Sequence, residues 1–289
     1  MQQLTDLDRL AELVARGDVA VLTGAGLSTE SGIPDYRGAT GAAQRRHSPM
    51  TYQEFTGSPE ARQRYWARSH VGWRTIGRAL PNPGHVAVAR LEQAGLLSGL
   101  VTQNVDGLHA AAGSRDVVEL HGALARVVCL GCGALTPRSA LDARLAAANA
   151  AWSGVVLALN PDGDALLDDT DVEGFTVVDC AACGGVLKPD VVFFGETVPA
   201  DRVAASFAVV DRAASLLVLG SSLHVMSGYR FVLHAVRRGI PVALVNLGPT
   251  RGDRHADLRL DAPLGAVLPG LVDRVMPRTA AAIATPSMP

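Results

Sequence analysis

Leu22-Thr-Gly-Ala-Gly-Leu-Ser-Thr-Glu-Ser-Gly-Ile-Pro-Asp-Tyr-Arg37 follows directly on the apolar run that begins at Val19. An apolar strand that opens into glycines lets backbone N–H groups approach a pyrophosphate, and a helix N-terminus beyond the turn adds partial positive charge. Gly24 and Gly26 supply such a turn. Alone, the turn predicts either a phosphate-binding loop or only a tight connection between a strand and a helix.

The residues after the turn differ from the fingerprint of a hydride-transferring dehydrogenase. That fingerprint has a third glycine where Thr29 stands and an acidic ribose ligand about 20 residues later, and neither is clear here. Ser28, Asp35 and Arg37 instead place polar groups beside the turn. They favour nucleotide binding and predict a nucleotide that is consumed as a reagent.

Composition limits the classes of partner. The chain has 289 residues, 48% of them hydrophobic, and a net charge of −2, which is enough to bury a sizeable core in one large domain or two smaller ones. Basic residues are spread out, so neither nucleic acid nor an anionic membrane is the expected partner. The N-terminus has no signal or transit pattern, and runs such as Leu216 to Leu219 are too short to span a bilayer. We expect a cytoplasmic protein.

The four cysteines form two Cys-x-x-Cys pairs, Cys129 with Cys132 and Cys180 with Cys183. Four thiolates at this spacing predict a tetrahedral, structural zinc site with no position left for water or substrate. Two disulfides are the alternative, which a cytoplasmic location disfavours. The 47 residues between the pairs exceed a compact zinc ribbon, and they predict a helix over 141–151 and an acidic loop over 160–174. That loop is interpreted as solvated, with a calcium site as the alternative.

Small or polar residues follow further apolar runs, at Gln103 to Asp106, at Gly220 to Ser222 and at Asn246. Because the carboxyl ends of parallel strands meet at one edge of a sheet, these residues predict a ligand-binding edge. His121 ends another apolar run, and Gly122 permits close approach of the backbone. A lone histidine is more often structural, but imidazole accepts protons near neutral pH, so this position makes it a candidate general base. The other histidines are interpreted as surface or packing residues.

Strands alternate with helical patterns over 203–214 and 229–238. The alternation predicts an α/β fold, a Rossmann-like doubly wound parallel sheet. A small zinc-binding module at about 123–189 and a helical insertion at about 39–79 interrupt it. The tail, residues 279–289, is predicted to be disordered.

Taken in order, these motifs resemble those of the sirtuin family over nearly the whole chain. They are Gly24 to Ser28, Pro34 to Arg37, Gln103 to Asp106, His121-Gly122, the two cysteine pairs, Gly220 to Ser222 and Asn246 to Gly248. The long spacing between the cysteine pairs, with Lys188 to Glu196 and Ser227 to Phe231, most resembles the class II branch, which includes an animal mitochondrial sirtuin. No mitochondrial presequence is expected here.

The resemblance implies a single catalytic domain over residues 1–278, whose Rossmann-like part covers about 1–38, 80–122 and 190–275. It implies an NAD-dependent protein-lysine deacylase that removes acetyl, longer, acidic or lipoyl groups. NAD is consumed, nicotinamide is released, and the acyl group leaves as O-acyl-ADP-ribose. His121 would be the general base on a ribose hydroxyl. One structural zinc ion and acylated-lysine protein substrates complete the implied set.

The resemblance also assigns contacts. The residues implied to contact NAD are Gly24, Ala25, Gly26, Ser28, Thr29, Ile33, Asp35, Tyr36, Arg37, Gln103, Asn104, Val105, Asp106, Gly220, Ser221, Ser222, Asn246, Leu247, Gly248 and Leu264. Substrate peptide would add as a strand between the two parts of the domain. The residues implied to contact it are Val192, Phe193, Phe194, Gly195, Leu223, His224 and Val225.

Two features depart from the common family pattern. Tyr36 replaces a phenylalanine, and His224-Val-Met-Ser alters the loop that faces the peptide. In addition, Tyr65 and Arg68 resemble the pair with which some branches bind acidic acyl groups, and three residues apart on a helix they share one face. The alternative is that Tyr65 packs in the core and Arg68 is solvated. Our hypothesis is that Arg68 favours negatively charged or bulky acyl chains over acetyl.

Two other functions stay open: a protein mono-ADP-ribosyltransferase that uses the same pocket, and an NAD or ADP-ribose sensor of low turnover. A binding module needs no base beside the ribose, so His121 disfavours the sensor. A dehydrogenase is more distant.

Overall fold

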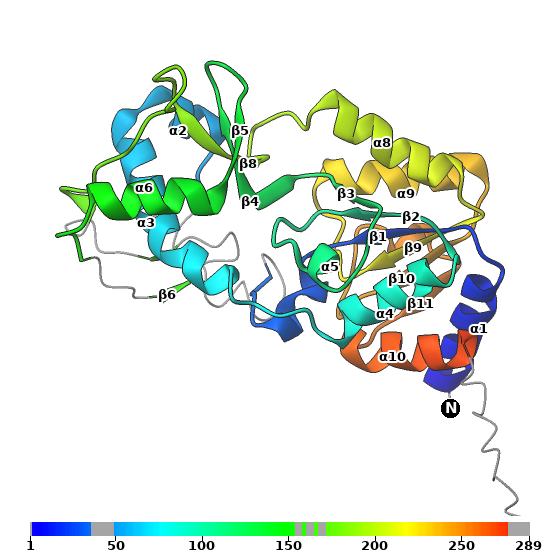
Figure 1. Ribbon diagram of the computed structural model, residues 1–289. Helices are drawn as coiled ribbons and strands as arrows, with labels where there is room; N and C mark the ends of the chain where they lie inside the picture. Colours follow the sequence, from blue (N-terminus) through cyan, green and yellow to red (C-terminus); the bar gives the residue numbers. More distant parts are fainter. Residues whose placement is uncertain (1, 36–48, 154–157, 160–164, 167–171, 277–289) are drawn as a thin grey trace, which may run out of the picture.

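The computed structural model describes residues 2–35, 49–153, 158–159, 165–166 and 172–276 (Figure 1). Its centre is a six-stranded parallel sheet in the order β11-β10-β9-β1-β2-β3. The strands are β1 (Val19–Thr23), β2 (Leu97–Thr102), β3 (Val117–Glu119), β9 (Ser215–Leu219), β10 (Val242–Val245) and β11 (Leu258–Leu260). Strand order reverses between β1 and β9, so the predicted doubly wound sheet is confirmed.

Helices cover both faces of this sheet, as parallel strands require. On one face lie α1 (Gln2–Ala15), α4 (Pro83–Gln93) and α10 (Leu264–Val275), and on the other α8 (Ala200–Asp211) and α9 (Met226–Arg238) (Figure 1). Every residue of β1, β9 and β10 is buried between these layers. No described helix is long and apolar enough to cross a membrane.

Two local predictions were wrong in detail. Short 3₁₀ turns, η1 (Ala25–Leu27) and η2 (Thr29–Ser31), follow β1 where an α-helix was expected. The helices α8, α9 and α6 (Arg138–Ala148) each begin three residues before the predicted start. Their first turns carry few apolar residues, so the hydrophobic period that guided the prediction becomes visible only one turn later.

A small domain packs beside the sheet. It contains the antiparallel sheet β5-β4-β8, formed by β4 (Gly122–Cys129), β5 (Leu135–Pro137) and β8 (Leu187–Val191), with helix α6. The short strands β6 (Ala158–Leu159) and β7 (Ala165–Leu166) belong to its insertion. The acidic 160–174 loop, with its calcium alternative, lies largely outside the described residues.

The helical insertion and the zinc module share one core. Phe55 on α2 (Tyr52–Gly57) and Trp66 on α3 (Pro59–Ile76) pack in the same buried cluster as Val127, Leu141 and Leu187. The indole N–H of Trp66 donates to the carbonyl of Leu187 at 3.2 Å. The two segments were predicted as separate insertions, because a contact across 121 residues leaves no local sequence pattern.

The two domains are joined where β3 passes into β4. Arg126 on β4 bonds Glu119 at 2.7 Å and Asp190 at 2.9 Å, and Asp190 also bonds Arg202 of α8 at 2.6 Å. Between them Gly122 has φ of +81°, and a Cβ there would overlap the carbonyl oxygen of Asp190. This junction therefore requires glycine, and it fixes the position of the neighbouring His121.

We expect Gly122→Ala to destabilise the protein far more than Gly17→Ala. Both glycines have φ of +81°, but a Cβ on Gly17 meets nothing within 4 Å. The left-handed conformation alone costs about 1–2 kcal/mol, and overpacking at Gly122 adds about 1–3 kcal/mol. Urea denaturation of both variants measures the difference, and equal losses would contradict this account of the junction.

Candidate active site

Glycines let the ends of β1 and β9 approach each other at the point where strand order reverses. The N–H of Gly24 donates to Leu219 at 3.0 Å, and the N–H of Gly26 donates to the carbonyl of Gly220 at 2.9 Å. A Cβ on Gly24 or Gly26 would lie 2.8–2.9 Å from the Gly220 carbonyl oxygen. Only glycine fits these positions, and the resulting crevice is where doubly wound sheets bind nucleotides.

A cavity of about 1420 Å³ opens from this crevice toward the small domain. It is lined by nearly all of the predicted contact residues: Gly24, Ala25, Gly26, Ser28, Thr29, Ile33, Asp35, Gln103, Asn104, Val105, Asp106, His121, Gly220, Ser221, Ser222, Asn246, Leu247, Gly248 and Leu264. Tyr36 and Arg37 lie outside the described residues. The volume, the glycine crevice and the polar wall fit a dinucleotide.

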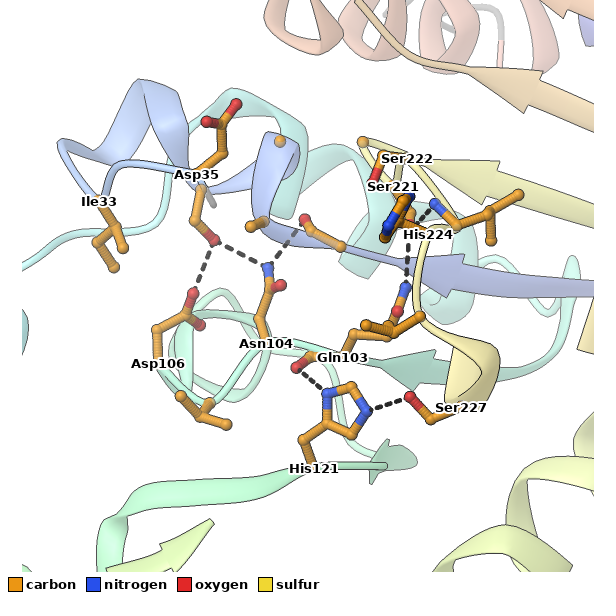
Figure 2. A pocket seen from close by; sticks show the side chains of 18 of the residues that line it. Ile33, Asp35, Gln103, Asn104, Asp106, His121, Ser221, Ser222, His224 and Ser227 are labelled. Carbon is orange, nitrogen blue, oxygen red and sulfur yellow. Dashed lines mark hydrogen bonds between the residues drawn. The ribbon is translucent and has the colours of Figure 1, made fainter. Parts of the chain in front are cut away.

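Polar side chains from separate loops meet on one wall of the cavity (Figure 2). Asn104 Nδ2 donates to Ser28 Oγ and to the carbonyl of Gly24, both at 3.1 Å. Ser28 Oγ donates to Asp106 at 2.7 Å. Gln103 Nε2 donates to Ser221 Oγ at 2.8 Å. These bonds hold the amides and the carboxylate in fixed orientations, which preorganises them for a ligand.

Two buried histidines support this wall. His85 Nε2 lies 3.4 Å from Ser28 Oγ, and His109 Nε2 lies 2.9 Å from Thr23 Oγ1. Their rings contact edge to face, with centroids 5.0 Å apart. Burial and then the neighbouring His85 lower the pKa of His109 to about 3, and burial lowers the pKa of His85 against the attraction of Asp106. His85 and His109 were expected in surface or packing roles; the structure buries both, and their ring nitrogens also lie beside Ser28 and Thr23 of the wall.

Stability should therefore fall in mild acid. Between about pH 6.5 and pH 3 an unfolded chain binds a proton at His109 that the folded chain does not, so the free energy of unfolding decreases as pH falls. We expect His109→Asn to reduce this slope, relative to wild type, between about pH 6.5 and pH 3. Equal slopes in urea titrations would contradict burial of a neutral His109.

His121 lies where β3 meets β4, with its ring on the cavity (Figure 2). Its Nδ1 is 2.9 Å from the carbonyl oxygen of Gln103, and its Nε2 is 2.9 Å from Ser227 Oγ. A carbonyl only accepts, so Nδ1 carries the proton of the neutral ring and Nε2 is the basic atom. Burial lowers the pKa of His121, and Arg202 and Arg230 lower it further, against the Gln103 carbonyl, which raises it. The ring is a neutral base at physiological pH.

The predicted peptide contacts lie on the same cavity. Val192, Phe193, Phe194 and Gly195 border it from the small domain, and Leu223, His224 and Val225 border it from the loop after β9. Lys188, the only lysine in the chain, braces the first loop: its Nζ donates to the Val191 carbonyl at 2.5 Å and pairs with Glu196 at 3.0 Å. Glu196 accepts from the Phe193 N–H at 2.8 Å. These bonds fix the shape of the first loop.

Tyr65 and Arg68 differ in position. Tyr65 lines the cavity and is buried in an aromatic cluster, 5.4 Å from Phe55 and 5.2 Å from Phe193 between ring centroids. Arg68 follows on α3 but is not among the residues that line the described cavity. Contact between Arg68 and an acyl chain stays a prediction.

Sequence reasoning missed several lining residues, including Glu30, Met226, Ser227, Arg230 and Asp261. Asp261 directly follows the short strand β11. Polar residues that follow strands were predicted to line the site, so Asp261 would have been included if β11 had been predicted. Ser227 and Arg230 belong to the motif Ser227 to Phe231, but they lie on helix α9, so they could not be predicted from the end of a strand. Their approach to His121 depends on tertiary structure.

The four cysteines gather away from this cavity, with all four Sγ atoms within 4.8 Å of one another. Cys129 Sγ is 3.5 Å from Cys183 Sγ, and Cys132 Sγ is 3.9 Å from Cys180 Sγ. These distances exclude disulfides, which need about 2.05 Å, and match the roughly 3.8 Å between thiolates that bind zinc at about 2.3 Å. The donor set fits a structural zinc ion that ties the β4–β5 turn to the turn before β8.

We expect Cys180→Ser to lower the zinc content and to unfold the small domain first. A structural zinc contributes folding free energy directly, so losing one thiolate weakens both binding and folding. Metal analysis together with near-ultraviolet circular dichroism tests this, and a chelator followed by added zinc serves as the reversible control. Native protein that retains full structure after its zinc has been removed would contradict this role.

The fold and the site together define a dinucleotide-binding α/β protein with a small zinc-binding domain. The family model described as Sir2 family matches residues 24–227, and the chain belongs to that family. It is 61% identical over 271 residues to NAD-dependent protein deacetylase 1 of Streptomyces coelicolor, covering 94% of this chain and 90% of that protein. It is 49% identical over 276 residues to the human NAD-dependent protein lipoamidase sirtuin-4, mitochondrial, covering 94% and 86%.

Solved structures agree with this placement. One described as "Sir2-p53 peptide-NAD+" superposes with a TM-score of 0.74 at 29% identity, covering 92% of this chain and 97% of that one. One described as "Sir2 bound to acetylated peptide" has a TM-score of 0.72 at 29% identity, covering 92% and 97%. The expected sirtuin fold is therefore confirmed.

Proposed function

We propose that this protein is an NAD-dependent protein-lysine deacylase. The acyl oxygen of a modified lysine displaces nicotinamide at the glycosidic carbon of NAD, and with one water consumed the acyl group passes to ADP-ribose and the free lysine is released. The observation that carries the proposal is the neutral His121, whose Nε2 faces a cavity with a nucleotide crevice on one side and two peptide-facing loops on the other. Relatives named as NAD-dependent deacetylases and lipoamidases support it.

The chain's own residues divide the work in this proposal. The glycine crevice receives the pyrophosphate, and Asn104 and Asp106 with Ile33 line the space for the nicotinamide ribose. When NAD is bound, its glycosidic carbon supplies the electrophile. His121 Nε2 takes the proton of a ribose hydroxyl, because a neutral hydroxyl is a weak acid and a poor nucleophile. The oxygen that has lost its proton then attacks the acyl carbon. The loops around Phe193 and His224 receive the substrate backbone as an added strand.

The acyl preference is a finer proposal. Tyr65 reaches the cavity from α3, and Arg68 lies three residues farther along the same helix. We propose that this pair favours acidic or bulky chains over acetyl. The predicted cytoplasmic location and the lack of nucleic-acid or membrane partners stay predictions.

The test is to incubate zinc-loaded protein with NAD and acetyl-, succinyl-, glutaryl- and lipoyl-lysine peptides, following nicotinamide release and peptide mass. We expect both products from wild type and a loss of about 10²- to 10⁴-fold in His121→Ala, the usual contribution of a general base. Because burial lowers the pKa of His121, activity should persist below the usual histidine range and fall only as pH passes that lowered pKa.

Arg68→Ala tests the proposed acyl preference separately from the proposed deacylase activity. We expect it to reduce kcat/KM for succinyl and glutaryl peptides while sparing acetyl peptides, and an unchanged preference would overturn the role of Arg68 alone. ADP-ribose attached to protein would favour the ADP-ribosyltransferase alternative. NAD binding without any turnover would favour the sensor.

A further inference from the structure

The hydroxyl of Ser227 is hydrogen-bonded to the basic ring nitrogen of His121. That hydroxyl lies 2.9 Å from Nε2, on the opposite side of the ring from the Gln103 carbonyl (Figure 2). Because Nδ1 holds the ring proton, Nε2 offers a lone pair, and the Ser227 hydroxyl must be the donor. The nitrogen that has to accept the ribose proton is therefore already engaged by a side chain 106 residues away.

The approach of Ser227 to the ring depends on the next residue. Ser227 belongs to the first turn of α9, and a Cβ on Gly228 would overlap the side-chain amide of Gln103. A glycine at this position lets the turn lie against Gln103, whose backbone carbonyl holds the other side of His121. The helix and the loop after β2 thus fix both nitrogens of one ring.

We propose that Ser227 is a positioning residue for His121, holding Nε2 unprotonated and oriented in the substrate-free enzyme and giving way to the ribose hydroxyl when substrate binds. The inference rests on the proposed function, since it takes His121 to be the base. Nε2 has one lone pair and accepts one donor at a time, so the two hydroxyls compete for it. Ser227 forms no covalent bond with substrate, and the proton of the ribose hydroxyl passes to Nε2 of His121.

A hydroxyl that donates to Nε2 stabilises the neutral ring and so opposes protonation. Its removal leaves the other groups around the ring in place. These are Arg202 of α8, which is paired with Asp190, Arg230 of α9, and the Gln103 carbonyl. A change in the titration of His121 in a Ser227 variant therefore reports the lost hydroxyl.

The first experiment titrates His121 in zinc-loaded protein without NAD, by long-range ¹H–¹⁵N NMR of the imidazole, with His121→Ala for assignment. We expect Ser227→Ala to raise the pKa of His121 by about half a unit to one unit, the equivalent of one hydrogen bond. Ser227→Thr and Ser227→Val form a matched pair of equal shape, in which only valine lacks the hydroxyl. Threonine should keep the wild-type pKa and valine should raise it. Identical titrations of the threonine and valine variants would overturn the proposal.

The pH dependence of turnover gives a second readout. The acid limb of kcat/KM reports the free enzyme, and that of kcat reports the substrate complex. We expect Ser227→Ala to move the first limb to higher pH and to leave the second in place, because substrate has already displaced Ser227. A merely structural role would lower activity without moving either limb. If wild type shows no NAD-dependent turnover, the proposed function fails, and the NMR titration still decides the role of Ser227.

Discussion

The structure depends on the close contact between the ends of β1 and β9. Gly24, Gly26 and Gly220 let two backbones meet there without side chains, which opens the crevice at the reversal of strand order. The loops that follow the parallel strands all lie at the carboxyl edge of the sheet, next to this contact. Gln103 after β2 and Ser221 after β9 are bonded to each other across it. A larger residue at any of the three glycines would separate the strands and disperse the site.

A second constraint is electrostatic. Burial lowers the pKa of His85, His109 and His121 at the site. His85 and His109 support the polar wall, and His121 lines the cavity. Neutral imidazoles add hydrogen bonds without adding positive charge to the site. The domain junction, in contrast, is held by charged side chains that pair with one another across β4, β8 and α8.

The sequence predicted most of the fold and of the site because both follow local rules. Asn104 and Asn246, which line the cavity, were predicted from the apolar runs that precede them, and the cluster of four cysteines was predicted from their spacing. What it missed depends on contacts distant along the chain. The shared core of α3 and the zinc module, the support from His85 and the bond from Ser227 to His121 join residues 57 to 121 positions apart. The helices α6, α8 and α9 each begin about one turn before the predicted start, because their first turns contain few apolar residues and so show no helical periodicity.

The central claim is that the acyl group leaves lysine for ADP-ribose at this cavity. The most direct measurement is the stoichiometry of nicotinamide, unmodified lysine peptide and O-acyl-ADP-ribose, quantified by mass spectrometry in a single reaction with an acyl-lysine peptide and NAD. The account predicts that the three products form in equal amounts and that no ADP-ribose attaches to protein. Nicotinamide release without O-acyl-ADP-ribose, or with ADP-ribose attached to protein, would contradict it.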